Sequence, residues 1–289
     1  MITSEELVSR SVKLISLPDV YIRLKAVIET PNSSMSDIAM VISHDPALTA
    51  RLLKLVNSSF YGFTGSIDTV THAINILGTR QVEELVFATT FASSLSSTRF
   101  SSHVMNMYDF WFNSVYCAVT ARLLAFHCDD IDTERPFVSG LLHDIGHLVL
   151  YSEIPEEAAP AMDIARQQAT SLHQAERELL GFDYAQVGAD LLRSWSLPDS
   201  LVEIIGCQNE PAKADDYQLE TAILNIAIAI TRLALAGIPV TPETLAIDPV
   251  CWEITGLSVD DMAATKEDVD DQAGVAMDIL FPRLSTTTH

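Results

Sequence analysis

The chain has 289 residues, 48% of them hydrophobic, and a formal net charge of −22 from 39 acidic and 17 basic residues. A surface this acidic repels phosphate backbones and anionic bilayers, which argues against nucleic acid and membranes as partners. The four cysteines lack CxxC spacing, and the N-terminus lacks a basic region followed by an apolar run, so we expect a reduced cytoplasmic protein. Zinc binding by these cysteines is the lesser alternative.

Apolar residues recur at helical spacing throughout the chain, and no alternation typical of strands is sustained, so we predict an all-α fold. Residues 34–37 have the pattern of a capping box, and Asp45 with Pro46 ends one helix and begins the next. Asn57 is expected to close that second helix in the left-handed conformation.

Further helices are expected from Val70 to a stop at Gly78 and from a cap at Thr79. Residues 93–103 are rich in serine and short of apolar residues, which predicts a loop or hinge. We therefore expect two helical lobes that share a core and a C-terminal helical extension, at residues 1–100, 101–238 and 239–289 respectively.

The second lobe opens with a long helix whose Trp111 we expect to anchor the core rather than to serve as a stacking platform. A single helix pattern over residues 138–150 carries the neighbouring His143 and Asp144, with His147 four residues after His143. Histidine and aspartate are residue types that bind divalent metal ions. Two ligands alone hold an ion weakly, so a metal site would need ligands from other segments.

Later segments continue the helical pattern. Ser171 and Gln174 have capping-box spacing at the start of a helix that should end at Gly181, and Asp183 should cap the next helix. Residues 217–236 are apolar nearly all round, which predicts a central buried helix.

The motif Gly-Leu-Leu-His-Asp-Ile-Gly-His at residues 140–147 resembles the HD superfamily of metal-dependent phosphohydrolases. Four further motifs resemble, in order, those of the HDOD (HD-related output domain) family; they lie at residues 15–20, 42–53, 56–62 and 73–78. The resemblance covers roughly residues 10 to 235. It implies an HD-domain-like helical bundle in which the second lobe is a degenerate HD-like lobe, and a role in bacterial signal transduction.

The resemblance also implies a metal-ligand set that this chain lacks in part. Hydrolytic HD enzymes use an upstream His, the His-Asp pair and a later Asp. The upstream position is Asn113, and residues 225–233, where the later acid should fall, contain no carboxylate. Where relatives often carry further histidines, this chain has Tyr184 and the pair Gln208 and Asn209.

We therefore expect His143 and Asp144 to be vestigial, held as a hydrogen-bonded pair that pins helices together, with no catalytic residue and no cofactor. The alternative is a divalent metal ion on His143 and Asp144, with Asn113 and His147 as weak additional ligands.

These observations lead to one main functional hypothesis and two alternatives. The main hypothesis is a non-catalytic HDOD-type regulatory domain that binds signalling proteins in trans. The first alternative is a metal-dependent phosphohydrolase acting on a nucleotide or phosphoester, and the second is a sensor whose vestigial pocket holds a small molecule.

Overall fold

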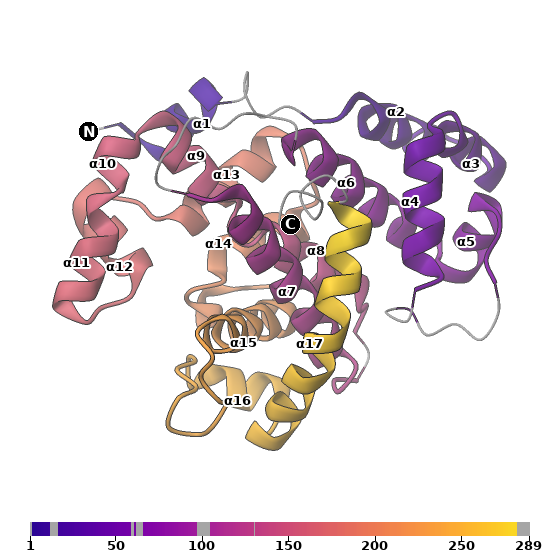
Figure 1. Cartoon of the computed structure of the whole chain (residues 1–289). Coiled ribbons are helices and arrows are strands. Elements are labelled where there is room, and N and C mark those ends of the chain that lie inside the picture. The colour runs from indigo at the N-terminus through magenta and orange to yellow at the C-terminus, as the bar shows by residue number, and fades with distance from the viewer. Residues whose placement is uncertain are drawn as a thin grey trace. The chain divides into compact units, whose positions relative to one another are not determined.

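The computed structural model of the chain describes residues 2–11, 17–58, 61, 66–96, 105–129 and 131–281. The regular elements of these residues are α-helices and one 3-10 turn (Figure 1), which confirms the predicted all-α fold. In chain order they are α1 (Ser4–Ser11), α2 (Asp19–Ile28), α3 (Met35–Ser43), α4 (Pro46–Val56), α5 (Val70–Leu77), α6 (Thr79–Ser96), α7 (Met107–Ala125), α8 (Glu134–Leu142), α9 (Ile145–Glu153), α10 (Pro155–Ala158), α11 (Pro160–Gln168), α12 (Leu172–Leu180), α13 (Tyr184–Ser194), α14 (Asp199–Cys207), η1 (Pro211–Lys213), α15 (Gln218–Leu235), α16 (Val250–Thr255) and α17 (Val259–Leu280).

The helices form two compact units. The first comprises Met1–Ser16 with Phe100–Glu267, and the second comprises Leu17–Arg99 with Asp268–His289. These bounds differ from the expected lobes, because α1 joins the unit that contains the His-Asp pair. Its side chains Leu7 and Val8 are buried, and the helix packs on α13 and α9. A short helix whose apolar side chains point inward is stabilised mainly by such packing.

The second unit contains α2 to α6, and its local signals behave as predicted. Ser34 and Asp37 form the capping box that opens α3. The side chain of Asp45 accepts hydrogen bonds from the first turn of α4, where Pro46 is the first residue. Gly78 ends α5 with φ at 91°, a conformation that glycine adopts at little cost.

Three local predictions in this unit are wrong or only partly within the described residues. Asn57 closes α4 with φ at −89°, not in the left-handed conformation, because its side chain bridges Leu53 and Ile67 through hydrogen bonds of 2.7 to 2.8 Å. Thr79 lies inside α6 rather than at its cap, and α6 runs on to Ser96 through the segment expected to be a loop. Residues 97–103 of that segment lie outside the described residues.

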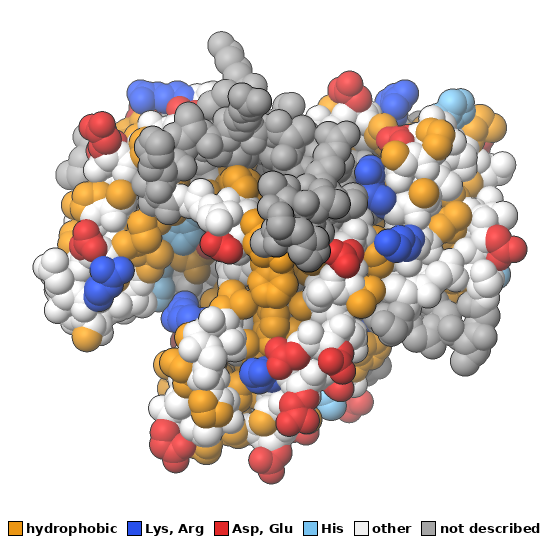
Figure 2. Space-filling model, viewed as in Figure 1, with side chains coloured by type: hydrophobic (Ala, Val, Ile, Leu, Met, Phe, Trp, Pro, Cys, Tyr) orange, Lys and Arg blue, Asp and Glu red, His pale blue; other side chains and the backbone are white. Residues whose placement is uncertain are grey.

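The first unit is built around α7, α8 and α15. Trp111 on α7 is fully buried and confirms the predicted core anchor. Helix α15 is long and apolar enough to span a membrane by length and composition, yet 56% of it is buried inside the fold, as in a core helix. On the face seen in Figure 2, acidic side chains gather around α16 and the nearby end of α17.

Helices α7 and α8 approach so closely that one position admits only glycine. A Cβ atom on Gly140 would lie 2.5 Å from the Cα atom and 2.7 Å from the nitrogen of Ala118. Real Cβ atoms do not make such contacts with backbone, so the two helices would have to separate.

Replacement of this glycine tests the close approach. Gly140→Ala should lower the free energy of unfolding by about 2 kcal/mol or more, because the methyl group must displace the α7 backbone. Gly274→Ala is the matched control: it lies in α17, where a Cβ atom would meet no heavy atom within 4 Å. The control should leave stability unchanged or raise it by up to about 1 kcal/mol. Urea unfolding measures both, and equal effects would contradict the packing described.

Candidate functional site

The His-Asp pair lies at a break between two helices. The prediction of one helix over residues 138–150 is wrong, because α8 ends at Leu142 and α9 begins at Ile145. The side-chain amide of Gln208 donates to the carbonyl oxygen of His143 at 2.9 Å. The N–H of His147 therefore bonds to the carbonyl of Asp144 at 3.0 Å rather than continuing the ladder to His143.

Just after the break between α8 and α9, helix α9 packs closely on α13. A Cβ atom on Gly146 would lie 1.9 Å from the carbonyl oxygen of Tyr184 and 2.9 Å from the nitrogen of Gly188. The glycine of the motif thus lets the two helices touch through their backbones. The first turn of α9 is held directly against the N-terminus of α13.

His143 is buried at the end of α8. Its Nδ1–H donates to the carbonyl oxygen of Gly140 at 2.7 Å, which leaves Nε2 as the acceptor. The amide of Asn113 approaches that Nε2 atom at 3.5 Å, so the structure brings one of the two weak candidate ligands, Asn113, next to His143. Burial lowers the pKa of His143, although nearby Asp144 opposes this. The ring is therefore neutral near pH 7.

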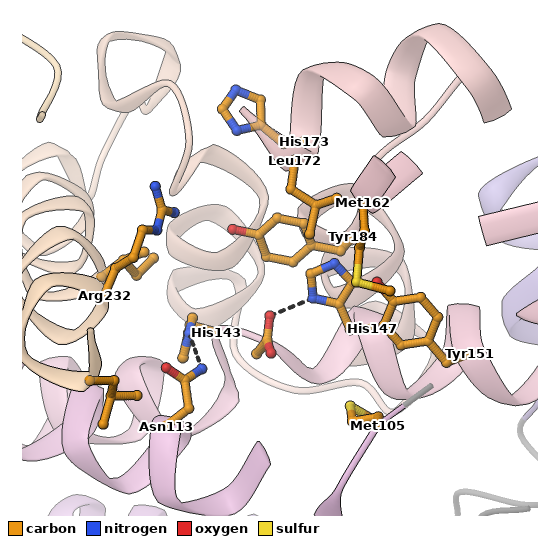
Figure 3. A pocket seen from close by; sticks show the side chains of 13 residues that line it. Met105, Asn113, His143, His147, Tyr151, Met162, Leu172, His173, Tyr184 and Arg232 are labelled. Carbon is orange, nitrogen blue, oxygen red and sulfur yellow. Dashed lines mark hydrogen bonds and ion pairs between the residues drawn. The ribbon is translucent and has the colours of Figure 1, made fainter. Parts of the chain in front are cut away.

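His147 has both ring nitrogens engaged. Nδ1 lies 2.5 Å from Oδ1 of Asp144, the contact marked by the dashed line from His147 in Figure 3. Nε2 lies 2.8 Å from Oε1 of Glu176. Two carboxylate acceptors require two N–H donors, which only the protonated imidazolium supplies. The ring stacks on Tyr184 with centroids 4.2 Å apart and on Tyr151 at 5.3 Å.

The charges around His147 set its protonation. Burial disfavours the imidazolium, but the carboxylates of Asp144 and Glu176 outweigh it and raise the pKa of His147 to about 10. The same pairing lowers the pKa of Asp144 to about 2 against the opposing effect of its desolvation. We call Asp144, His147 and Glu176 the imidazolium triad.

Glu176 is the member of the triad that the sequence analysis missed. Its side chain is fully buried on α12, and its second oxygen accepts the N–H of Tyr184 at 2.9 Å. The missed signal is its position four residues from both Leu172 and Leu180, on the apolar side of the helix. A carboxylate there must find a partner inside the fold.

The expected capping box on the same helix is wrong. Ser171 precedes α12 without capping it. Its hydroxyl instead lies 3.1 Å from Nε2 of His173, while Gln174 accepts a hydrogen bond from Thr170 at 2.5 Å. By contrast, the stop at Gly181 and the cap by Asp183 form as predicted.

A cavity of about 400 Å³ lies beside His143 and Asp144, and all of its lining residues belong to the first unit. In Figure 3, Arg232 and the Tyr184 hydroxyl lie on one side of it and Tyr151 and Met105 on the other. Its lining residues come from the loop before α7 and from α7, the helix break, α9, α11, α12, α13 and α15: Met105, Asn113, His143, Asp144, His147, Tyr151, Met162, Leu172, His173, Tyr184, Ile228, Arg232 and Leu235.

The residues around the cavity do not fit a metal centre of the HD type. Across the described ranges, no group of three or more His, Cys, Asp or Glu side chains is arranged to hold an ion. His147 has no ring nitrogen to offer while Asp144 and Glu176 bind it. The remaining positions carry amides and a phenol: Tyr184 donates to Asn209 at 3.1 Å, and Asn225 donates to the carbonyl of Gln208 at 2.7 Å.

A pH series tests the imidazolium. The pKa of His147 is raised from 6.5 to about 10 on folding, so its stabilising contribution is complete below pH 6.5 and lost as the pH rises through 10. His147→Gln cannot carry the charge, and we expect it to cost about 3 kcal/mol in free energy of unfolding at the lower pH. Urea unfolding of both proteins from pH 6.5 to 10 should show this difference shrinking. A difference independent of pH would refute the assigned charge.

Comparisons with known proteins place the chain in a family. Residues 14–211 match the model of the HDOD domain. An "Uncharacterized protein" of Treponema pallidum (strain Nichols) is 27% identical over 203 residues, which cover 70% of this chain and 39% of that protein. The chain thus spans well under half the length of that curated relative.

Solved structures share the whole fold. A "Putative phosphohydrolase" from Shewanella amazonensis SB2B is 28% identical with a TM-score of 0.69, covering 95% of this chain and 97% of that one. An HDOD domain protein with unknown function from Geobacter sulfurreducens is 21% identical with a TM-score of 0.69, covering 96% and 98%. With the family model matched over most of its length, the chain belongs to the HDOD domain family.

Proposed function

We propose that the chain is a non-catalytic regulatory domain of bacterial signal transduction that binds signalling proteins in trans in the cytoplasm. The proposal includes no resident metal ion and no nucleic-acid or membrane partner. Membership of the HDOD domain family supports the signalling role, since that family consists of HD-related output domains. The net charge of −22 supports a protein partner over a polyanionic one.

One observation carries the non-catalytic part of the proposal. Asp144 and His147 are bound to each other, and Glu176 occupies the other nitrogen of His147. A hydrolytic metal needs several free ligands to stay bound while it activates a water molecule. To recruit this pair, an ion would first have to break a buried charge-assisted hydrogen bond and leave Glu176 without its partner.

The second candidate is the metal-dependent phosphohydrolase. One observation favours it: the Shewanella amazonensis relative named a "Putative phosphohydrolase" is 28% identical and matches nearly end to end. His143 also favours this candidate, because its Nε2 lies 3.5 Å from the amide of Asn113, a contact too long for a strong hydrogen bond that would compete with an ion. In that case His143 and Asp144 would hold the ion.

Metal analysis and turnover separate the two candidates. Protein purified without chelators would be analysed for bound metal, then assayed with bis(p-nitrophenyl) phosphate in the presence of Mn²⁺, Mg²⁺ or Fe²⁺. We expect no stoichiometric metal and no turnover above that of His143→Ala. His173→Ala is the matched control, because it removes a histidine from the same cavity wall but not from the pair.

The outcome that would contradict the proposal is specific. Stoichiometric metal with turnover that is lost in His143→Ala and kept in His173→Ala would establish the phosphohydrolase. The regulatory role also requires a partner, which cross-linking in the native host would identify. Its binding should then be reproduced with the two purified proteins, and failure of every cross-linked candidate to bind would count against that role.

A further inference from the structure

The cavity beside the imidazolium triad has an apolar wall that is partly exposed among the residues the structure describes. Ile228 and Leu235 lie seven residues apart on one face of α15, with Arg232 between them. Leu235 is 47% exposed, although most of α15 is buried. Leu172 and Met162 add apolar surface from α12 and α11. Exposed apolar side chains around a concave site are typical of ligand pockets.

Arg232 places a positive charge at this wall, and among the described residues no carboxylate forms a direct ion pair with it, although its charge helps to lower the pKa of Asp144. Within residues 105–129 and 131–281, other arginines each form an ion pair with a carboxylate: Arg122, Arg135, Arg166, Arg177 and Arg193. Arg232 forms none with the described residues, and the nearest acid of the cavity, Asp144, is bound to His147. A guanidinium in this situation can bind an external carboxylate through two parallel hydrogen bonds.

The charge balance of the site favours one negative charge on the ligand over two. Asp144 and Glu176 carry two negative charges, which His147 and Arg232 balance with two positive ones. A monoanion leaves one net negative charge in the site, whereas a phosphomonoester dianion leaves two. The protein's net charge of −22 adds to the repulsion of the dianion.

We propose that this cavity binds a small organic monocarboxylate, with its carboxylate on Arg232 and its apolar body against Ile228, Leu235 and Leu172. The volume of about 400 Å³ lies toward the lower end of small-molecule sites, so the ligand is compact. The inference rests on the proposed function, because a regulatory domain uses such a cavity to hold a ligand rather than to process one.

Matched probes test both halves of the ligand. Isothermal titration calorimetry would compare 4-phenylbutyrate, its neutral amide 4-phenylbutyramide, phenyl phosphate and inorganic phosphate. We expect the carboxylate to bind roughly tenfold or more tightly than the amide, because the amide cannot form the charge-assisted pair. Inorganic phosphate should not bind, because it lacks an apolar body.

Two arginine variants locate the contact. Arg232→Met keeps the apolar stem and removes the charge, and should abolish the preference for the carboxylate. Arg193→Met is the control, since Arg193 is likewise solvent-exposed but pairs with Asp190 outside the cavity. It should bind 4-phenylbutyrate as the wild type does. Circular dichroism would verify that both variants are folded.

Several results would overturn the inference. These are equal binding of acid and amide, binding unchanged in Arg232→Met, tighter binding of phenyl phosphate than of the carboxylate, or no binding of 4-phenylbutyrate at millimolar concentration. None of them bears on the proposed function. Metal-dependent hydrolysis of phenyl phosphate, in contrast, would contradict the proposed function whatever the carboxylate does.

Discussion

The protonated ring of His147, held between the carboxylates of Asp144 and Glu176, is the interaction on which the site depends. It joins the start of α9 to α12, and Glu176 extends the link to the backbone of Tyr184 at the start of α13. Helices α9, α12 and α13 thus meet at one buried cation. Asp144, His147 and Glu176 bind one another and thereby hold these helices together.

The helices whose limits are set locally could be predicted from the sequence. The capping box of Ser34 and Asp37 and the left-handed stop at Gly181 involve residues within one turn of each other. Predictions failed where a distant group decides. Asn57 is held by Ile67, ten residues on, and the helix expected over residues 138–150 is interrupted because Gln208 takes the carbonyl of His143. The spacing of apolar residues along the sequence does not indicate such distant hydrogen-bond partners.

The same distinction between features set locally and features set by distant residues applies to the candidate site. The amide at Asn113 and the acid-free segment 225–233 are visible in the sequence, and they are the reason that the sequence analysis expects a site short of HD-type ligands. The partners of the remaining polar groups around the site could not be predicted from the sequence. Pairing of Asp144 with His147 follows from the turn between α8 and α9, and the roles of Glu176 and Arg232 depend on how α12 and α15 pack around the cavity. Burial turns an ordinary helical glutamate into a structural counter-ion.

The central claim, that His147 is an imidazolium locked between two carboxylates, is tested most directly by nitrogen-15 NMR of its ring near neutral pH, with and without zinc. Zinc is diamagnetic, so it leaves the signals observable. The account predicts that both ring nitrogens of His147 are protonated and that their shifts do not change when zinc is added. Loss of one ring proton, together with a zinc-induced shift of that nitrogen, would contradict it and would identify the site as a working metal centre.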